Sequence, residues 1–399
     1  MNTKITFSII LFINFSIFGQ VNQTMKRLPD TGQTSSYTNT FGEDSDFSIN
    51  EPYYIDNGNQ TITDTITNLM WQKSDGGEMT YENAIIYCDT LTIGGFTDWR
   101  LPNCHELFSI LSLDVTNPAL NSSYFTTTNA EYWWSSQLQA NDPTKVWVTN
   151  AGGGVGNHLK TETISAGGNK HFNVKAVRGI TIPEQIQSHF TINNDGTVID
   201  NLTNLMWQQI PYNDSLTWEQ ALIYADTLNI GNFNDWRLPN IKELQSLNDE
   251  TITNPSINSN IFDGILPKHY WSSTSLPNQQ TKAWYLDVKF GLTTYAYKTS
   301  RQYLICTRTL NQSSNLSLNK EIKINNIEIY PNPTNNNLSF KTNLPISDFR
   351  VENLNGQIIT SNLIDNQNNS YCFSIEYSGI YFVKFNVDGK SICNKIIVK

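Results

Sequence analysis

Apolar residues recur with helical spacing in two stretches of this 399-residue chain. In the first stretch, Ala84, Cys88 and Leu91 keep the period of an amphipathic helix, which predicts a helix over residues 80–91. The same pattern returns over 217–228. Strand-like segments precede the two helices, at 61–71 and 197–207, and short aromatic strands close each half. The same order of elements is therefore predicted twice.

The hexapeptide DWRLPN follows each predicted helix. Because alternate side chains of an extended segment share a face, Trp99 and Trp236 are expected to point into the core. Arg100 and Arg237 then point the other way, together with the neighbouring aspartates. We interpret each arginine as half of a structural Asp-Arg pair and keep both as candidates for ligand contact.

The residues after the hexapeptide predict a helix start. Asn103 with Glu106 has the spacing of a capping box, and Asn240 with Glu243 repeats it. The first box is expected to open a helix over 104–113. Both glutamates are therefore expected to be structural caps worth roughly 1 kcal/mol each, rather than catalytic acids.

Equivalent motifs lie about 137 residues apart, which is the length of a domain rather than of a solenoid repeat. The final stretch has alternating strands and tight turns, a pattern typical of an all-β sandwich. The expected divisions are a signal peptide (1–19), an irregular lead-in (20–50), copy 1 (51–180), copy 2 (188–310), a linker (311–326) and a final domain (327–399).

The N-terminus has the pattern of an export signal. An apolar run from Ile5 to Phe18 is too short to span a bilayer and ends before Gly19. No other stretch is apolar for long enough to predict a transmembrane segment. The net charge of −10 becomes −11 when Lys4 leaves with the signal peptide, and no basic run remains. We therefore expect no nucleic-acid partner.

Several separated motifs recur in one order: NLMWQ, DWRLPN followed by EL, YWSS, and a W-x-x-[ND] strand. From about residue 28 to 310 the chain resembles the Lcl C-terminal domain family of bacterial surface proteins. LPDTGQT and GEDSDF in the lead-in resemble what precedes such domains. The resemblance implies an α+β, C-type-lectin-like fold for each copy, with few regular elements, and a role in surface display and adhesion.

The last domain carries YPNP, LNG, GIYFVK and a terminal basic KIIVK. Together these motifs resemble the C-terminal sorting domain of type IX secretion. We expect a small all-β immunoglobulin-like sandwich. The resemblance implies the type IX secretion machinery as a partner, and a location that is secreted or at the outer cell surface.

Five cysteines cannot all pair internally. In the Lcl family the positions of Cys88 and Cys306 within a copy often both carry cysteine, so each copy has kept one half. A bridge between Cys88 and Cys306 and a bridge between Cys88 and Cys104 are open alternatives. Cys372 and Cys393 are a candidate pair within the last domain.

Catalytic motifs are absent from the sequence. The histidines show no H-x-H or H-E-x-x-H spacing, and no G-x-S-x-G occurs. The cysteine pair that formylglycine-generating enzymes use is also missing from both copies. We expect no enzyme; the alternative is a polysaccharide-active enzyme, a glycosidase or a formylglycine-generating-like protein on the same scaffold.

Ten tryptophans, eighteen tyrosines and many amides favour recognition of an extracellular glycan or glycoprotein. Trp133 is adjacent to Trp134 on a predicted strand, so one of the two is expected to face away from the core. The candidate ligand contacts are Trp133, Tyr270, Arg100, Arg237, Asn150 and Asp287. No cofactor is expected, apart from weak Ca²⁺ candidates at Glu43, Asp44 and Asp46, for which a solvated acidic loop is the favoured interpretation.

Overall fold

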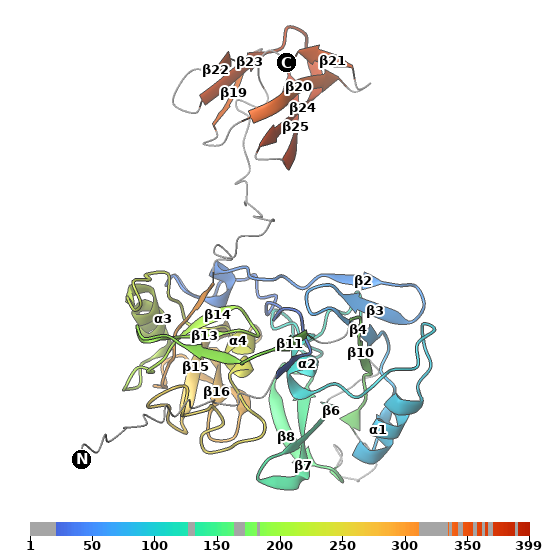
Figure 1. The fold of residues 1–399 in the computed structure, drawn as a ribbon, viewed down its shortest axis with the longest axis vertical. Helices are drawn as coiled ribbons and strands as arrows, with labels where there is room; N and C mark the ends of the chain where they lie inside the picture. Colours follow the sequence, from blue (N-terminus) through green and yellow to red (C-terminus); the bar gives the residue numbers. More distant parts are fainter. Residues whose placement is uncertain are drawn as a thin grey trace, which may run out of the picture. The chain divides into compact units, whose positions relative to one another are not determined.

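The protein is described from a computed structural model that divides into two compact units, Met1–Asn311 and Gln312–Lys399 (Figure 1). The described residues are 21–126, 132–162, 172–181, 184–310, 334, 337–341, 346–353, 357–360, 364–365, 370–387 and 390–399. The expected signal peptide and linker lie outside these ranges.

In copy 1, one antiparallel sheet has the order β10-β4-β3-β2, and a larger sheet has the order β5-β9-β6-β7-β8. The strands are β2 (Tyr54–Asp56), β3 (Thr61–Asp64), β4 (Leu69–Gln72), β5 (Glu78–Met79), β6 (Tyr132–Gln139), β7 (Asp142–Asn150), β8 (Val155–Leu159), β9 (Phe172–Asn173) and β10 (Val177–Gly179). The helices are α1 (Tyr81–Thr90) and α2 (Cys104–Ser109). Both faces of the larger sheet are buried, because one packs on the core beside α2 and the other on the core beside α1.

Copy 2 repeats this arrangement with the sheets β12-β13-β14-β18 and β15-β16-β17. Its strands are β12 (Phe190–Ile192), β13 (Thr197–Asp200), β14 (Leu205–Gln208), β15 (His269–Ser275), β16 (Lys282–Asp287), β17 (Leu292–Tyr297) and β18 (Thr307–Thr309), and its helices are α3 (Trp218–Thr227) and α4 (Ile241–Ser246). A two-stranded sheet joins β1 (Val21–Gln23) in the lead-in to β11 (Glu184–Ile186) between the copies.

The two predicted amphipathic helices form as α1 and α3, but the α+β class expected for each copy is wrong. Strand residues far outnumber helix residues in the described part of the chain, and its four α-helices have only ten or six residues each. The helix expected over 104–113 already ends at Ser109, because Leu111 turns back to bridge Leu120. Most of each core is therefore formed by sheets and ordered loops.

The two copies share one core rather than forming separate domains. Ile241, Leu276 and Trp284 of copy 2 belong to the same buried cluster as Leu107 and Trp147 of copy 1. Equivalent elements meet at this junction, since α2 contacts α4 and β8 contacts β17. The tandem region is therefore one compact unit.

The described lead-in is mostly irregular, and two short stretches of it, 29–33 and 42–44, are largely buried. The ammonium of Lys242 donates to the carbonyls of Asp30 (2.7 Å) and of Ser109 in copy 1 (2.8 Å). The Gln33 side chain forms hydrogen bonds with both the N–H and the carbonyl of Ser275. The lead-in therefore holds the two copies together.

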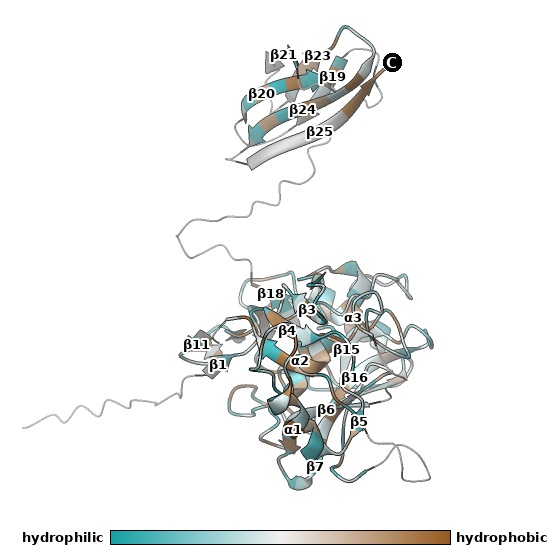
Figure 2. Cartoon of the chain, turned by 90° about the vertical axis from the view of Figure 1, so that its right-hand side faces the viewer, coloured by the Kyte–Doolittle hydropathy of each residue, from teal (hydrophilic) through white to brown (hydrophobic). Residues whose placement is uncertain are grey.

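The second unit is an all-β sandwich of two sheets, β19-β23-β22 and β21-β20-β24-β25. Its strands are β19 (Asn337–Lys341), β20 (Ile346–Asn353), β21 (Ile358–Thr360), β22 (Ile364–Asp365), β23 (Ser370–Ser374), β24 (Gly379–Val387) and β25 (Lys390–Val398). Apolar and polar residues alternate along β20 and β24 (Figure 2). Phe340 and Phe373 from one sheet pack against Val351 and Phe385 from the other, so the alternation buries a core between the sheets.

Candidate functional site

Trp133 is buried, so the expectation that it faces outward is wrong. Trp133 is 1% exposed and Trp134 is 0% exposed. Their strand, β6, lies between β9 and β7 in a sheet that is covered on both faces. Adjacent side chains therefore enter two different cores, and neither indole is available to a ligand at the surface.

Tyr270, which occupies the same position in copy 2, is also fully buried. Its hydroxyl accepts a hydrogen bond from the Leu266 N–H at 3.0 Å, and burial raises the pKa of Tyr270 to about 12. This residue supports the core rather than a binding surface.

The two hexapeptide arginines bind glutamates rather than the adjacent aspartates. Arg100 forms a two-point contact with Glu106 at 2.7 Å, and Arg237 forms one with Glu243 at 2.6 Å. The predicted capping boxes are confirmed, because each glutamate also accepts the N–H of its N-cap asparagine. The predicted Asp-Arg pairing is wrong: Asp98 instead binds Arg178 of β10, as Asp235 binds Arg308 of β18.

Asn150 and Asp287 organise turns. The Asn150 side chain accepts hydrogen bonds from the N–H groups of Gly152 and Gly154, and the Asp287 side chain accepts one from the N–H of Lys289. Asn150 and Asp287 each lie one position along from the residue that pairs with Trp133 or Tyr270, so they face the other side of the sheet from these two candidates.

The acidic residues of the lead-in have protein partners. Glu43 accepts from the Ser275 hydroxyl at 2.5 Å, and Asp44 accepts from the Thr274 hydroxyl at 2.5 Å. Asp46 accepts the N–H groups of Gly42 and Glu43. Across the described ranges, no group of three or more histidine, cysteine, aspartate or glutamate side chains is arranged to hold a metal ion. The loop therefore acts as part of the junction between the copies.

Neither disulfide expected to involve Cys88 forms. Cys88, Cys104 and Cys306 are buried free thiols in three different core clusters. Burial raises the pKa of Cys88 to about 12 and keeps its thiol protonated. The proposed Cys372–Cys393 pair stays a prediction, because the Cys393 side chain lies outside the described residues.

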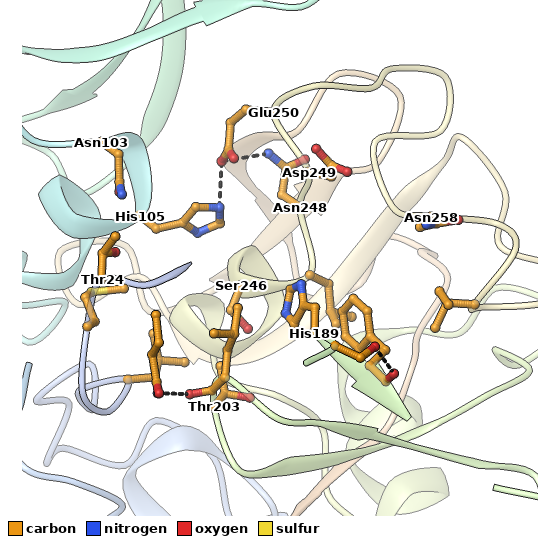
Figure 3. Close-up of a pocket in the computed structure, with 18 of the residues that line it drawn as sticks. Thr24, Asn103, His105, His189, Thr203, Ser246, Asn248, Asp249, Glu250 and Asn258 are labelled. Atoms are coloured by element: carbon orange, nitrogen blue, oxygen red, sulfur yellow. Dashed lines mark hydrogen bonds and ion pairs between the residues drawn. The ribbon is translucent and has the colours of Figure 1, made fainter. Parts of the chain in front are cut away.

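A cavity, called the junction pocket here, lies where both copies and the lead-in meet. Its volume is about 560 Å³, within the usual range for small-ligand sites. Its walls come from lead-in residues 23–28, from α2 and β6 of copy 1, and from β12 and the loop after α4 of copy 2. Figure 3 shows its polar side chains converging from these elements.

A charged pair crosses this pocket. His105 points from α2 toward Glu250 of copy 2, and its Nε2 lies 2.7 Å from the carboxylate (Figure 3). Asn248 donates a weaker hydrogen bond to the same carboxylate at 3.3 Å. Burial lowers the pKa of His105, but the charge of Glu250 and hydrogen bonds with Glu250 and the Asn248 backbone outweigh this effect, so the pKa is raised. The pair therefore favours the charged imidazolium.

Three amide side chains supply neutral donors to the pocket. The side-chain oxygens of Asn103, Gln137 and Asn258 accept backbone N–H groups, namely those of Glu106, Cys104 and Asn260. Their NH₂ groups donate no hydrogen bond within the described residues. Because the oxygens fix the amide orientation, the donors are held in place for a ligand.

Apolar surface also lines the pocket. It includes Met25, Leu247, Ile261 and Phe190, and the imidazole of His189 stacks on the Phe190 ring at 3.8 Å. The His189 Nε2 lies 3.2 Å from the buried Asp200 carboxylate. The pocket therefore combines fixed polar groups with an apolar surface.

Copy 1 has a smaller hollow in the equivalent place. It has a volume of about 310 Å³ and is lined by Tyr54, Leu111 and Asn121, at the positions of Phe190, Asn248 and Asn258. Several lead-in residues between 30 and 48 line this hollow, so the lead-in reaches both cavities.

Sequence reasoning missed His105 and Glu250. The available signal was a difference between the copies: His105 stands where copy 2 has Lys242, and Glu250 stands where copy 1 has Leu113. Glu250 is a charged residue at a position that is apolar in copy 1, and such a difference indicates a role that is specific to copy 2.

These features define a tandem repeat that packs as one unit, followed in the chain by a separate β-sandwich. The Lcl C-terminal domain model matches residues 60–178 and 196–308, and the secretion system C-terminal sorting domain model matches 328–399. The chain therefore belongs to the Lcl C-terminal domain family, and both resemblances seen in the sequence are confirmed. No curated protein matches the chain.

The sorting domain assigns the protein to type IX export and to the cell exterior, secreted or at the outer surface, as predicted. Within the part of the chain that is described, no helix is long and apolar enough to cross a membrane.

Proposed function

We propose that the protein is a non-enzymatic recogniser of extracellular glycans or glycoproteins that binds a sugar end in the junction pocket. The observation that carries the proposal is the pocket itself, which combines three oriented amide donors with apolar surface. Sugars have hydroxyls that accept such donors and C–H faces that pack on apolar surface. Export to the cell exterior brings this pocket to such ligands.

The carboxylates of the pocket are oriented by protein donors. Glu250 is held by His105 and Asn248, while Asp249 accepts from the N–H (2.9 Å) and hydroxyl (2.5 Å) of Thr251. The protein donors contact one oxygen of each carboxylate, Oε1 of Glu250 and Oδ1 of Asp249, and these contacts hold both groups in a fixed orientation. The opposite charges of His105 and Glu250 offset each other, so binding in the pocket is expected to respond little to salt.

The test is a glycan array with the full mature chain, followed by titration of the strongest ligand with variants. Asn258→Ala removes one oriented donor and is expected to weaken binding about two- to tenfold, the loss of one neutral hydrogen bond. Asn121→Ala is the matched control, because Asn121 caps the equivalent turn in copy 1. Unchanged affinity with Asn258→Ala, or turnover of the bound glycan by the purified protein, would contradict the proposal.

A further inference from the structure

Two exposed tyrosines stand next to each other along the edge strand β17. Tyr295 is 40% exposed and Tyr297 is 58% exposed. Side chains two residues apart on a strand share a face, so their attachment points are about 7 Å apart. Lys282 of β16 pairs with Tyr297 across the sheet, and its Nζ lies 4.9 Å and 5.0 Å from the centroids of the Tyr295 and Tyr297 rings. We call these three residues the tyrosine platform.

The platform is anchored to the core. The Tyr295 ring packs edge-on against Trp284, with centroids 5.6 Å apart and an interplanar angle of 88°. Trp284 is 2% exposed and belongs to the core shared by the two copies. The first ring is therefore held in place before any ligand arrives, which lowers the entropy cost of binding.

The fold does not require these tyrosines. Tyr295 pairs with Trp284 and Tyr297 with Lys282, and in copy 1 the equivalent Trp147 and Lys145 pair with Asn157 and Leu159. Copy 1 thus forms the same hairpin without aromatic residues at either position.

The lysines also differ between the copies. Lys145 lies 3.6 Å from the Asp142 carboxylate, whereas Lys282 has no carboxylate partner among the described residues. The platform therefore presents an uncompensated positive charge beside two rings, on a chain whose net charge is −10.

We propose that the tyrosine platform is a second binding site and that its ligand is a carboxylated polysaccharide chain. Pyranose rings stack on Tyr295 and Tyr297, and a sugar carboxylate reaches the ammonium of Lys282. The proposal rests on the proposed function only for the class of ligand, because none of the three residues lines the junction pocket. A site that extends along an edge strand fits the middle of a polysaccharide, whereas the junction pocket fits the terminal sugar.

The test is native gel electrophoresis of the mature protein through gels that contain polygalacturonate or, for comparison, neutral hydroxyethyl cellulose. The double variant Tyr295→Asn, Tyr297→Leu carries the copy 1 residues, so the fold is expected to tolerate it; an unchanged thermal unfolding midpoint checks this. The expected result is retardation by polygalacturonate that weakens on the order of tenfold in the double variant and also falls in Lys282→Gln. Asn258→Ala, in the junction pocket, is expected to leave the retardation unchanged.

Three outcomes overturn the platform: no retardation by polygalacturonate, retardation that survives the double variant, or equal retardation by the neutral polymer. Loss of retardation in Asn258→Ala alone would assign the binding to the junction pocket instead. Failure of the glycan array with intact platform binding would reject the proposed function of the pocket and leave the platform standing.

Discussion

The arginine–glutamate pair of the hexapeptide occurs twice with different burial, which allows its energetics to be tested within one chain. The Arg237 and Glu243 side chains are 5% and 4% exposed, whereas Arg100 is 42% exposed beside a fully buried Glu106. Both pairs have two short contacts, and both glutamates sit in the same capping box. Burial of the arginine is therefore the main difference.

The test is Glu243→Gln, compared with Glu106→Gln. Glutamine at the third helical position still accepts the N-cap N–H, so the cap survives and only the charge is lost. The Arg237 guanidinium stays charged and becomes a buried cation without its partner, which costs about 3–5 kcal/mol. Arg100 reaches water when its partner is lost, so Glu106→Gln is expected to cost about 1–2 kcal/mol, between the values for buried and exposed pairs.

The assay is urea unfolding of the mature chain followed by tryptophan fluorescence. All ten tryptophans lie between Trp71 and Trp284, so the signal reports the first unit alone. The free energy of unfolding from each transition gives the two costs. Equal costs for the two variants, or a larger cost for Glu106→Gln, would refute the reasoning from burial.

Three further outcomes are expected. Burial and the charge of Asp30 raise the pKa of Asp44 to about 8, so this carboxyl lowers stability as the pH rises from about 4 through 8; in Asp44→Asn the melting temperature should fall less between pH 5 and 9 than in the wild type. Fragment 188–310 alone exposes Ile241, Leu276 and Trp284 and lacks the lead-in, so it should show no cooperative unfolding; a sharp transition by circular dichroism would contradict this. Deleting 327–399 should trap a folded first unit in the periplasm, and surface delivery of the truncated chain on fractionation would be the opposite result.

Local features of the fold could be predicted from the sequence. Asn103 and Asn240 begin helices because their side chains accept the third N–H of the helix, a contact within four residues. Trp99 and Trp236 are 2% and 3% exposed, as strand alternation predicts. Such features depend on residues that are close in sequence, and the occurrence of each motif in both copies supports the prediction twice.

Features that depend on which segments meet could not be predicted. The partner of Asp98 is Arg178, 80 residues away on β10, and a strand pattern does not specify that pairing. The burial of Trp133 could not be predicted for the same reason. Strand alternation assigns Trp133 and Trp134 to opposite faces of the sheet, but it does not show that other segments cover both faces. The junction pocket needs His105 and Glu250, which come together only after the copies pack.

The packing of the copies also explains why the pocket arises where it does. Equivalent surfaces meet at the junction, so His105 and Lys242, which are equivalent residues, both reach across it. With lysine on one side, the ammonium closes onto the carbonyls of Asp30 and Ser109. On the other side, the shorter side chain of His105 contacts Glu250 of copy 2, and both residues line the junction pocket. The difference between the two copies at this position therefore accompanies a smaller hollow of about 310 Å³ on the lysine side and a cavity of about 560 Å³ on the histidine side.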